Sequence, residues 1–145
     1  MADAYRQMLD LVKAALTGLD STGANVTEQP PDSIDRAMLP ALSVRAGDVV
    51  VSDVVESADS DAHLETHRLG VEVTSVCTSI AARDQSALEV KVALLNDARP
   101  GALRRYTRSD FAESGEGERP IYAVRQRFEI DYYVEATAPD VIVAR

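Results

Sequence analysis

One cluster of side chains in the sequence has the composition of a metal site, in the segment His63-Leu64-Glu65-Thr66-His67. Two histidines and a carboxylate can supply three ligands and leave coordination positions open for a substrate. A strand would space His63 and His67 about 13 Å apart, too far to share an ion bound at about 2 Å. On a helix they would share a face, but the segment leads into a strand pattern and lacks the H-E-x-x-H order of zinc proteases. We therefore predict no metal here, with a small metal-dependent enzyme that uses His63, Glu65 and His67 as the alternative.

Cys77 is the only cysteine of the chain. A lone cysteine within an apolar strand is usually a small buried hydrophobic residue, and no base adjoins this one in the sequence. An intrachain disulfide is not possible, which fits a reducing compartment. The sequence predicts a structural role for Cys77.

Motifs of nucleotide and acyl chemistry are absent from the sequence. There is no G-x-x-x-x-G-K or G-x-G-x-x-G phosphate loop and no G-x-S-x-G nucleophile turn. The Gly115-Glu116-Gly117-Glu118 segment would repel a phosphate because of its two carboxylates. We therefore predict a protein that is not an enzyme and that has no catalytic residue and no cofactor.

Charge is the pattern that remains. The 24 acidic and 15 basic residues give a net charge of −9, which opposes direct binding to nucleic acid. The basic residues cluster after residue 98, and a later segment alternates polar with apolar side chains. Such segments suit contacts with another subunit or simply face solvent. We predict subunit or tube contacts at Arg99, Arg104, Arg105, Arg108, Arg125, Arg127, Glu129 and Asp131.

Hydrophobic periodicity predicts two helices. Apolar residues recur at three- and four-residue spacing over residues 4–19, with Asp3 as a cap, and again over residues 84–97. The second stripe consists of Leu88, Val92 and Leu95, after a cap at Asp84 or Ser86.

Alternating apolar residues predict strands at 41–46, 64–78 and 122–135. The valines of segment 49–55 either continue the first strand or begin a hairpin arm. The other segments are expected to be irregular: 25–38, with at most a short strand at 24–27; the acidic loop 56–61; the segment 102–118; and the tail after Pro139, which is too short to fold alone.

These elements predict one domain over residues 1–145, of the α/β class and α+β type. We expect a mixed, mostly antiparallel sheet with two main helices packed on one face. The core should be aliphatic because aromatic residues make up only 5% of the chain. No window reaches the ~20 apolar residues of a membrane span, and the start lacks the order of a signal peptide, so we expect no membrane association or export.

The order of several motifs carries a family resemblance. An amphipathic helix (residues 5–19) precedes Thr22-Gly23-Ala24, a proline-rich loop and the strand start Leu39-Pro40-Ala41-Leu42-Ser43-Val44. A central helix follows, and then the strand Tyr122-Ala123-Val124-Arg125-Gln126-Arg127-Phe128-Glu129-Ile130. Over nearly its whole length the chain resembles the tail terminator family of long-tailed bacteriophages, also called minor tail protein U or tail completion proteins.

The resemblance implies a mixed α/β fold and a function. Members of this family form a hexameric ring that caps the tail tube, ends its polymerisation and offers a surface for head attachment. The implied partners are further copies of the chain, the tail tube protein and the head-tail connector protein. The implied location is the virion tail, assembled in the cytoplasm of the host bacterium of a phage or prophage. The arginine-rich segment 104–108 and the longer acidic segment 56–61 depart from the family pattern. Another neck or minor tail protein, or a monomeric adaptor, is the alternative.

Overall fold

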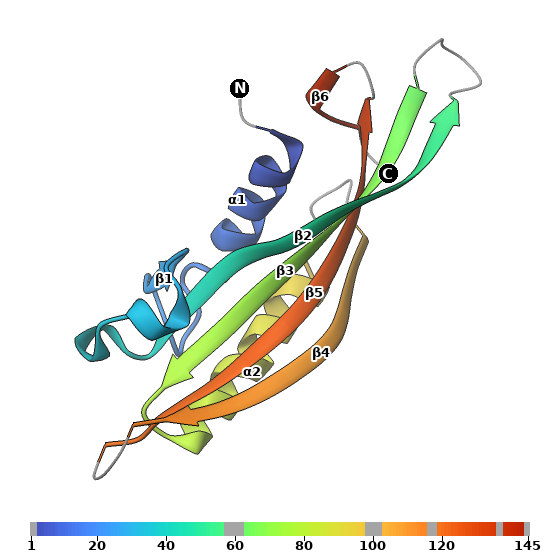
Figure 1. The fold of residues 1–145 in the computed structure, drawn as a ribbon. Coiled ribbons are helices and arrows are strands. Elements are labelled where there is room, and N and C mark those ends of the chain that lie inside the picture. Colours follow the sequence, from blue (N-terminus) through green and yellow to red (C-terminus); the bar gives the residue numbers. More distant parts are fainter. Residues whose placement is uncertain (1–2, 57–62, 98–102, 116–118, 136–137, 144–145) are drawn as a thin grey trace.

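The computed structural model describes residues 3–56, 63–97, 103–115, 119–135 and 138–143. Two helices and six strands follow one another in the order shown in Figure 1. Their bounds are α1 (Ala4–Leu16), β1 (Val26–Thr27), β2 (Ala41–Glu56), β3 (His63–Cys77), α2 (Ile80–Leu95), β4 (Leu103–Ser114), β5 (Ile121–Glu135) and β6 (Ala138–Val143). Two short 3₁₀ turns, Pro31–Ser33 and Arg36–Met38, lie between β1 and β2.

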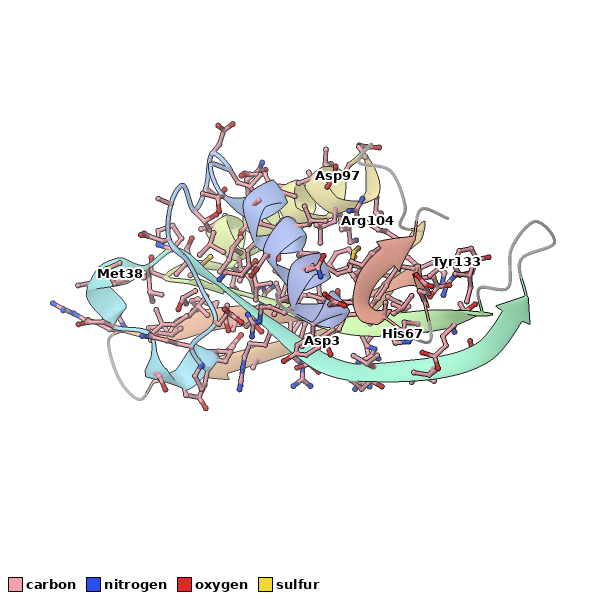
Figure 2. The ribbon with its side chains drawn as sticks, turned by 90° about the horizontal axis from the view of Figure 1, so that it is seen from above. Asp3, Met38, His67, Asp97, Arg104 and Tyr133 are labelled. Atoms are coloured by element: carbon pink, nitrogen blue, oxygen red, sulfur yellow. The ribbon has the colours of Figure 1, made fainter. Side chains whose placement is uncertain are left out.

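The strands form one sheet in the order β1-β2-β3-β5-β4, and β6 pairs with β5. Only β1 and β2 are parallel, and every other pair is antiparallel. Both helices lie on the same side of the sheet, as Figure 2 shows. The predicted α+β fold, with a mixed, mostly antiparallel sheet and two helices on one face, is confirmed.

The first helix follows from its sequence pattern. The Asp3 side chain caps it by accepting a hydrogen bond from the Tyr5 backbone N–H at 3.1 Å. The apolar stripe is buried against the sheet and includes Met8, Val12 and Leu16. The helix ends at Leu16, earlier than predicted, because Gly18 takes a positive φ of 96° and starts a tight turn.

The second helix was predicted correctly in type but not in start or in buried face. It begins at Ile80 and is capped by Ser79, whose side chain accepts a hydrogen bond from the Ala82 N–H at 3.1 Å. The buried residues are Ser86, Val90 and Leu94. The predicted stripe, Leu88, Val92 and Leu95, is instead 55%, 52% and 46% exposed. Because both sets have helical spacing, periodicity alone does not decide which of them faces the sheet.

The expectation that residues 102–118 are irregular is wrong. Residues 103–114 form β4, which pairs with β5 along its whole length. A bulge between Tyr106 and Arg108 shifts the register, so the alternation of the sequence changes phase in the middle of the strand.

The segment 49–55 continues β2 past a bulge at Gly47. Of the predicted acidic loop, Glu56 ends β2, and residues 57–62 lie outside the described residues. The C-terminal tail does not fold alone, since β6 pairs with the end of β5.

The long strand β5 is central and forms much of the core. Its predicted apolar face is buried at Val124, Phe128, Ile130, Tyr132 and Val134. This face belongs to the same hydrophobic core as the buried residues of both helices, and its other side is the polar face of the sheet. The alternation predicted for this strand is therefore confirmed from Val124 to Val134, whereas Tyr122, also predicted on the apolar face, is only partly buried, and Asp131 is buried on the polar face.

Candidate interaction surfaces

The histidine cluster lies on a strand, as the distance argument assumed. In β3 the His67 Nε2 and Glu65 Oε1 atoms lie 3.3 Å apart, and the His67 ring packs against the Tyr132 ring with centroids 5.6 Å apart. The side chain of His63 lies outside the described part of the structure. Among the described residues, no group of three or more His, Cys, Asp or Glu side chains is arranged to hold a metal ion.

Cys77 is buried at the end of β3. Burial raises the pKa of the Cys77 thiol to about 11, although Arg83 acts in the opposite direction. The thiolate, which is the reactive form, is therefore a small fraction of the population at neutral pH.

We expect native protein at pH 8 to react with Ellman's reagent at least about 100-fold more slowly than the unfolded chain, because the Cys77 thiol is both buried and protonated. The absorbance of the released thiol measures this rate, and reaction in guanidinium should reach one thiol per chain. Cys77→Ser is the control for background. Rapid labelling of the native protein would contradict the buried position.

The structure gathers six of the predicted contact residues on the uncovered face of the sheet. They are Arg105, Arg108, Arg125, Arg127, Glu129 and Asp131. Cross-strand pairing places them beside charged residues of β2, β3 and β4, and several of them form ion pairs.

Asp131 lies at the centre of the largest ion-pair group on this face. Its carboxylate accepts hydrogen bonds from Arg68 Nε at 2.9 Å and from Arg105 Nη2 at 3.0 Å. Its exposed fraction is only 3%. Burial acts to raise the pKa of the Asp131 carboxyl, but the hydrogen bonds from Arg68 and Arg105 outweigh it and hold that pKa below its usual value. Asp131 therefore orders this face and is not an open contact residue.

The other charges of this face are also engaged within the chain. Arg127 Nη2 lies 2.7 Å from Asp48 Oδ1. Asp110 Oδ2 lies 2.9 Å from Arg108 Nε and 3.4 Å from Arg125 Nη2. These pairs are exposed, so each stabilises the fold little, and the face remains accessible to a partner.

Arg104 does not belong to this face. It pairs with Ile130 in the β4–β5 register, so its side chain lies on the helix side of the sheet. Its Nη2 atom lies 3.4 Å from Asp97 Oδ2, and its Nη1 donates to the Asp97 carbonyl oxygen at 3.0 Å. Figure 2 shows the two residues next to each other beyond the end of α2. Arg104 was predicted as a subunit or tube contact, and in the single chain its side chain is only 5% exposed. Arg99 lies outside the described residues.

Exposed apolar side chains form surfaces that the sequence analysis did not predict. On β2, Val49, Val50 and Val51 are 39%, 50% and 50% exposed. On β4, Phe111 is 64% exposed. The signal for the first group was present in the sequence, because three consecutive valines on a strand cannot all lie on the buried face.

The apolar stripe of α2 borders a shallow hollow of about 410 Å³. Leu88, Val92 and Ala93 line it from α2, and Leu19 lines it from the turn after α1. Acidic residues, Asp20 and Glu89, complete its wall. Its apolar lining is typical of a protein contact, and it has no basic side chain that would bind an anion.

Both lateral strands of the sheet have an open edge within the described part of the chain. The outer edge of β2 is covered by β1 only at Leu42 and Ser43. At the opposite edge of the sheet, β4 pairs with β5 alone among the described residues. In Figure 1 these edges lie on opposite sides of the long strands β3 and β5. Open edges of this kind can accept a further strand through backbone hydrogen bonds.

Comparison of the sequence with known protein families matches no family model, and comparison with curated proteins finds no match. The helices of the described part are too short or too polar to cross a membrane.

Proposed function

We propose that this chain is a structural protein of a bacteriophage tail, a terminator that assembles into a hexameric ring on the tail tube. The ring ends polymerisation of the tube and offers a surface for head attachment. The proposal starts from the resemblance of the sequence to tail terminators. The α+β fold with both helices on one face is of the kind that this resemblance implies.

The observation that carries the proposal is the exposure of apolar side chains at separate places on the sheet edges and on α2. Val50, Val51 and Phe111 lie on the lateral strands, and Leu88 and Val92 lie on the helix. The α2 residues line one shallow hollow, and contiguous apolar exposure of this kind marks sites of protein contact in a folded chain. A subunit of a ring that also binds a tube needs more than one such surface, because it contacts two neighbours and the tube.

Particle mass and shape test this proposal directly. We expect light scattering to give six times the 15.7-kDa chain mass, and negative-stain images to show six-fold rings. Added to a polymerising tail tube protein, the chain should bind the tube end and shorten the tubes, because a capped end accepts no further subunits.

Two outcomes would count against the proposal. A single 15.7-kDa species at every concentration, with or without tubes, would favour a monomeric adaptor. Rings that bind a connector protein but leave tube length unchanged would favour a neck protein instead.

A further inference from the structure

We propose that the open edge of β2 in one copy of this chain pairs with the open edge of β4 in the next copy, so that the sheet continues from subunit to subunit. This inference deepens the proposed function and rests on it for ring closure. The occupant of each edge is therefore a second copy of the chain.

The placement of the two edges requires a second copy. In the strand order, β3 and β5 separate β2 from β4, so the edges cannot meet within one chain. Both strands are long, since β2 spans 16 residues and β4 spans 12. Only the first part of the β2 edge is covered by β1. A contact between two different edges is heterologous, and such contacts form a ring when the rotation between neighbouring subunits closes and an open filament when it does not.

The net charges of the two strands are opposite: β2 has three acidic residues and one basic residue, and β4 has three basic residues and two acidic ones, which lie in its second half. Residues 47–56 contain Asp48, Asp53 and Glu56 and no basic residue. Residues 103–108 contain three arginines and no acidic residue. Arg104 is turned toward Asp97, which leaves Arg105 and Arg108 on the other face of β4. Like charges facing each other on paired strands are unfavourable. Charge therefore favours β2 with β4 over β2 with β2 or β4 with β4.

The apolar exposure of the two strands supports the same pairing. Val50 and Val51 are each 50% exposed on β2, on opposite faces of the strand, and Phe111 is 64% exposed on β4. A strand added at either edge would cover part of these side chains. Neither strand carries the lysine or proline that commonly protects an open edge from pairing, and the only such device that the described residues of both strands contain is a β-bulge. Arginine on β4 does not repel the acidic β2 edge.

Complementary edge variants test the pairing. Val50→Glu/Val51→Glu damages the β2 edge, and Arg108→Glu/Phe111→Glu damages the β4 edge. Each variant alone should lose the ring and sediment as a 15.7-kDa monomer. An equimolar mixture should give dimers and no ring, because each partner contributes one intact edge and the two damaged edges repel each other.

A matched control separates this contact from apolar exposure in general. Leu88→Glu/Val92→Glu on α2 removes two aliphatic side chains that are 55% and 52% exposed, with the same change in charge as the β2 variant. It should retain the ring. Circular dichroism should show that all three variants keep the fold of the parent chain.

Several results would overturn the pairing: rings that survive both edge variants, a mixture that stays monomeric, dimers formed by the β4-edge variant alone, or a parent chain that is monomeric at every concentration. Failure of the proposed function is distinguishable from these results. Rings that depend on both edges but leave tube length unchanged would remove the terminator function and keep the pairing. Rings that cap tubes and persist in both edge variants would support the terminator function and remove the pairing.

Discussion

Replacing Arg104 by Ala is expected to lower the free energy of unfolding by about 3 to 5 kcal/mol, because the change removes the cation from a buried ion pair. The side chains of Arg104 and Asp97 are only 5% and 10% exposed. Water therefore cannot readily replace the guanidinium beside the carboxylate. Urea unfolding followed by circular dichroism measures the change.

A control and a double variant sharpen this prediction. Arg108→Ala, on the same strand but 63% exposed, is expected to change stability little. Arg104→Met combined with Asp97→Leu should recover much of the loss, because it removes both charges from the interior together. A loss below about 1 kcal/mol in Arg104→Ala would show that the pair contributes little.

Because Arg104 is buried and Arg108 is exposed, the two arginines are not equally suitable for testing ring assembly. Reversing the charges of Arg104 and Arg105 together, which the sequence alone would suggest, would disturb a buried pair as well as a surface. Loss of rings in that variant would then report unfolding as readily as a lost contact. Arg108 and Phe111 are the better targets because both are exposed on the β4 edge.

The strand β5 could be predicted from the sequence and β4 could not. Along β5 the alternation keeps one phase, broken only by the buried polar residue Gln126, and a core residue such as Phe128 marks its buried face. Along β4 the bulge after Tyr106 changes the phase, and an edge strand needs few apolar residues. The arginines of β4 were therefore expected in an irregular segment.

Which surface each arginine reaches depends on the fold around it. Arg104 and Arg105 are neighbours in the sequence, yet they lie on opposite faces of β4 because side chains alternate along a strand. The partner of Arg104 is Asp97, just beyond α2, and that of Arg105 is Asp131 on β5. The basic cluster can therefore be found in the sequence, but the sequence does not show that Arg104 is buried while Arg105 lies on the uncovered face.

Which face of α2 is buried also depends on the tertiary structure. Leu88 and Leu94 are equally apolar, but only Leu94 lies on the sheet side. The small Ser86 allows close approach, and its hydroxyl donates a hydrogen bond to Ser75 of β3 at 2.9 Å. The larger apolar residues Leu88, Val92 and Leu95 form a clearer helical stripe in the sequence than Ser86, Val90 and Leu94 do. The exposed stripe was therefore the one predicted.

Replacing Asp131 by Asn is expected to lower the free energy of unfolding by about 2 to 4 kcal/mol at pH 7, because Arg68 and Arg105 lose a shared and nearly buried carboxylate. The estimate lies below the range for a fully buried pair because the two arginines are 47% and 37% exposed. Urea unfolding at a series of pH values measures both the loss and its pH dependence.

The direction of that pH dependence follows from the lowered pKa of Asp131. A carboxyl group whose pKa is lower in the folded chain than in the unfolded chain stabilises the fold above its ordinary value, about 3.9. That stabilisation is lost as the pH falls through the lower, folded value. The difference in stability between the parent chain and Asp131→Asn should therefore be constant near neutral pH and should shrink below about pH 4.

A second aspartate provides the control for this experiment. The pKa of Asp110 is also lowered, mainly by the hydrogen bond from Arg108, but its side chain is 37% exposed and its pairs are open to solvent. Asp110→Asn should leave the acid-dependent loss of stability close to that of the parent chain. If Asp131→Asn likewise leaves it unchanged, the carboxylate is held no more tightly in the folded chain than in the unfolded one, and Asp131 is not the residue that orders the polar face.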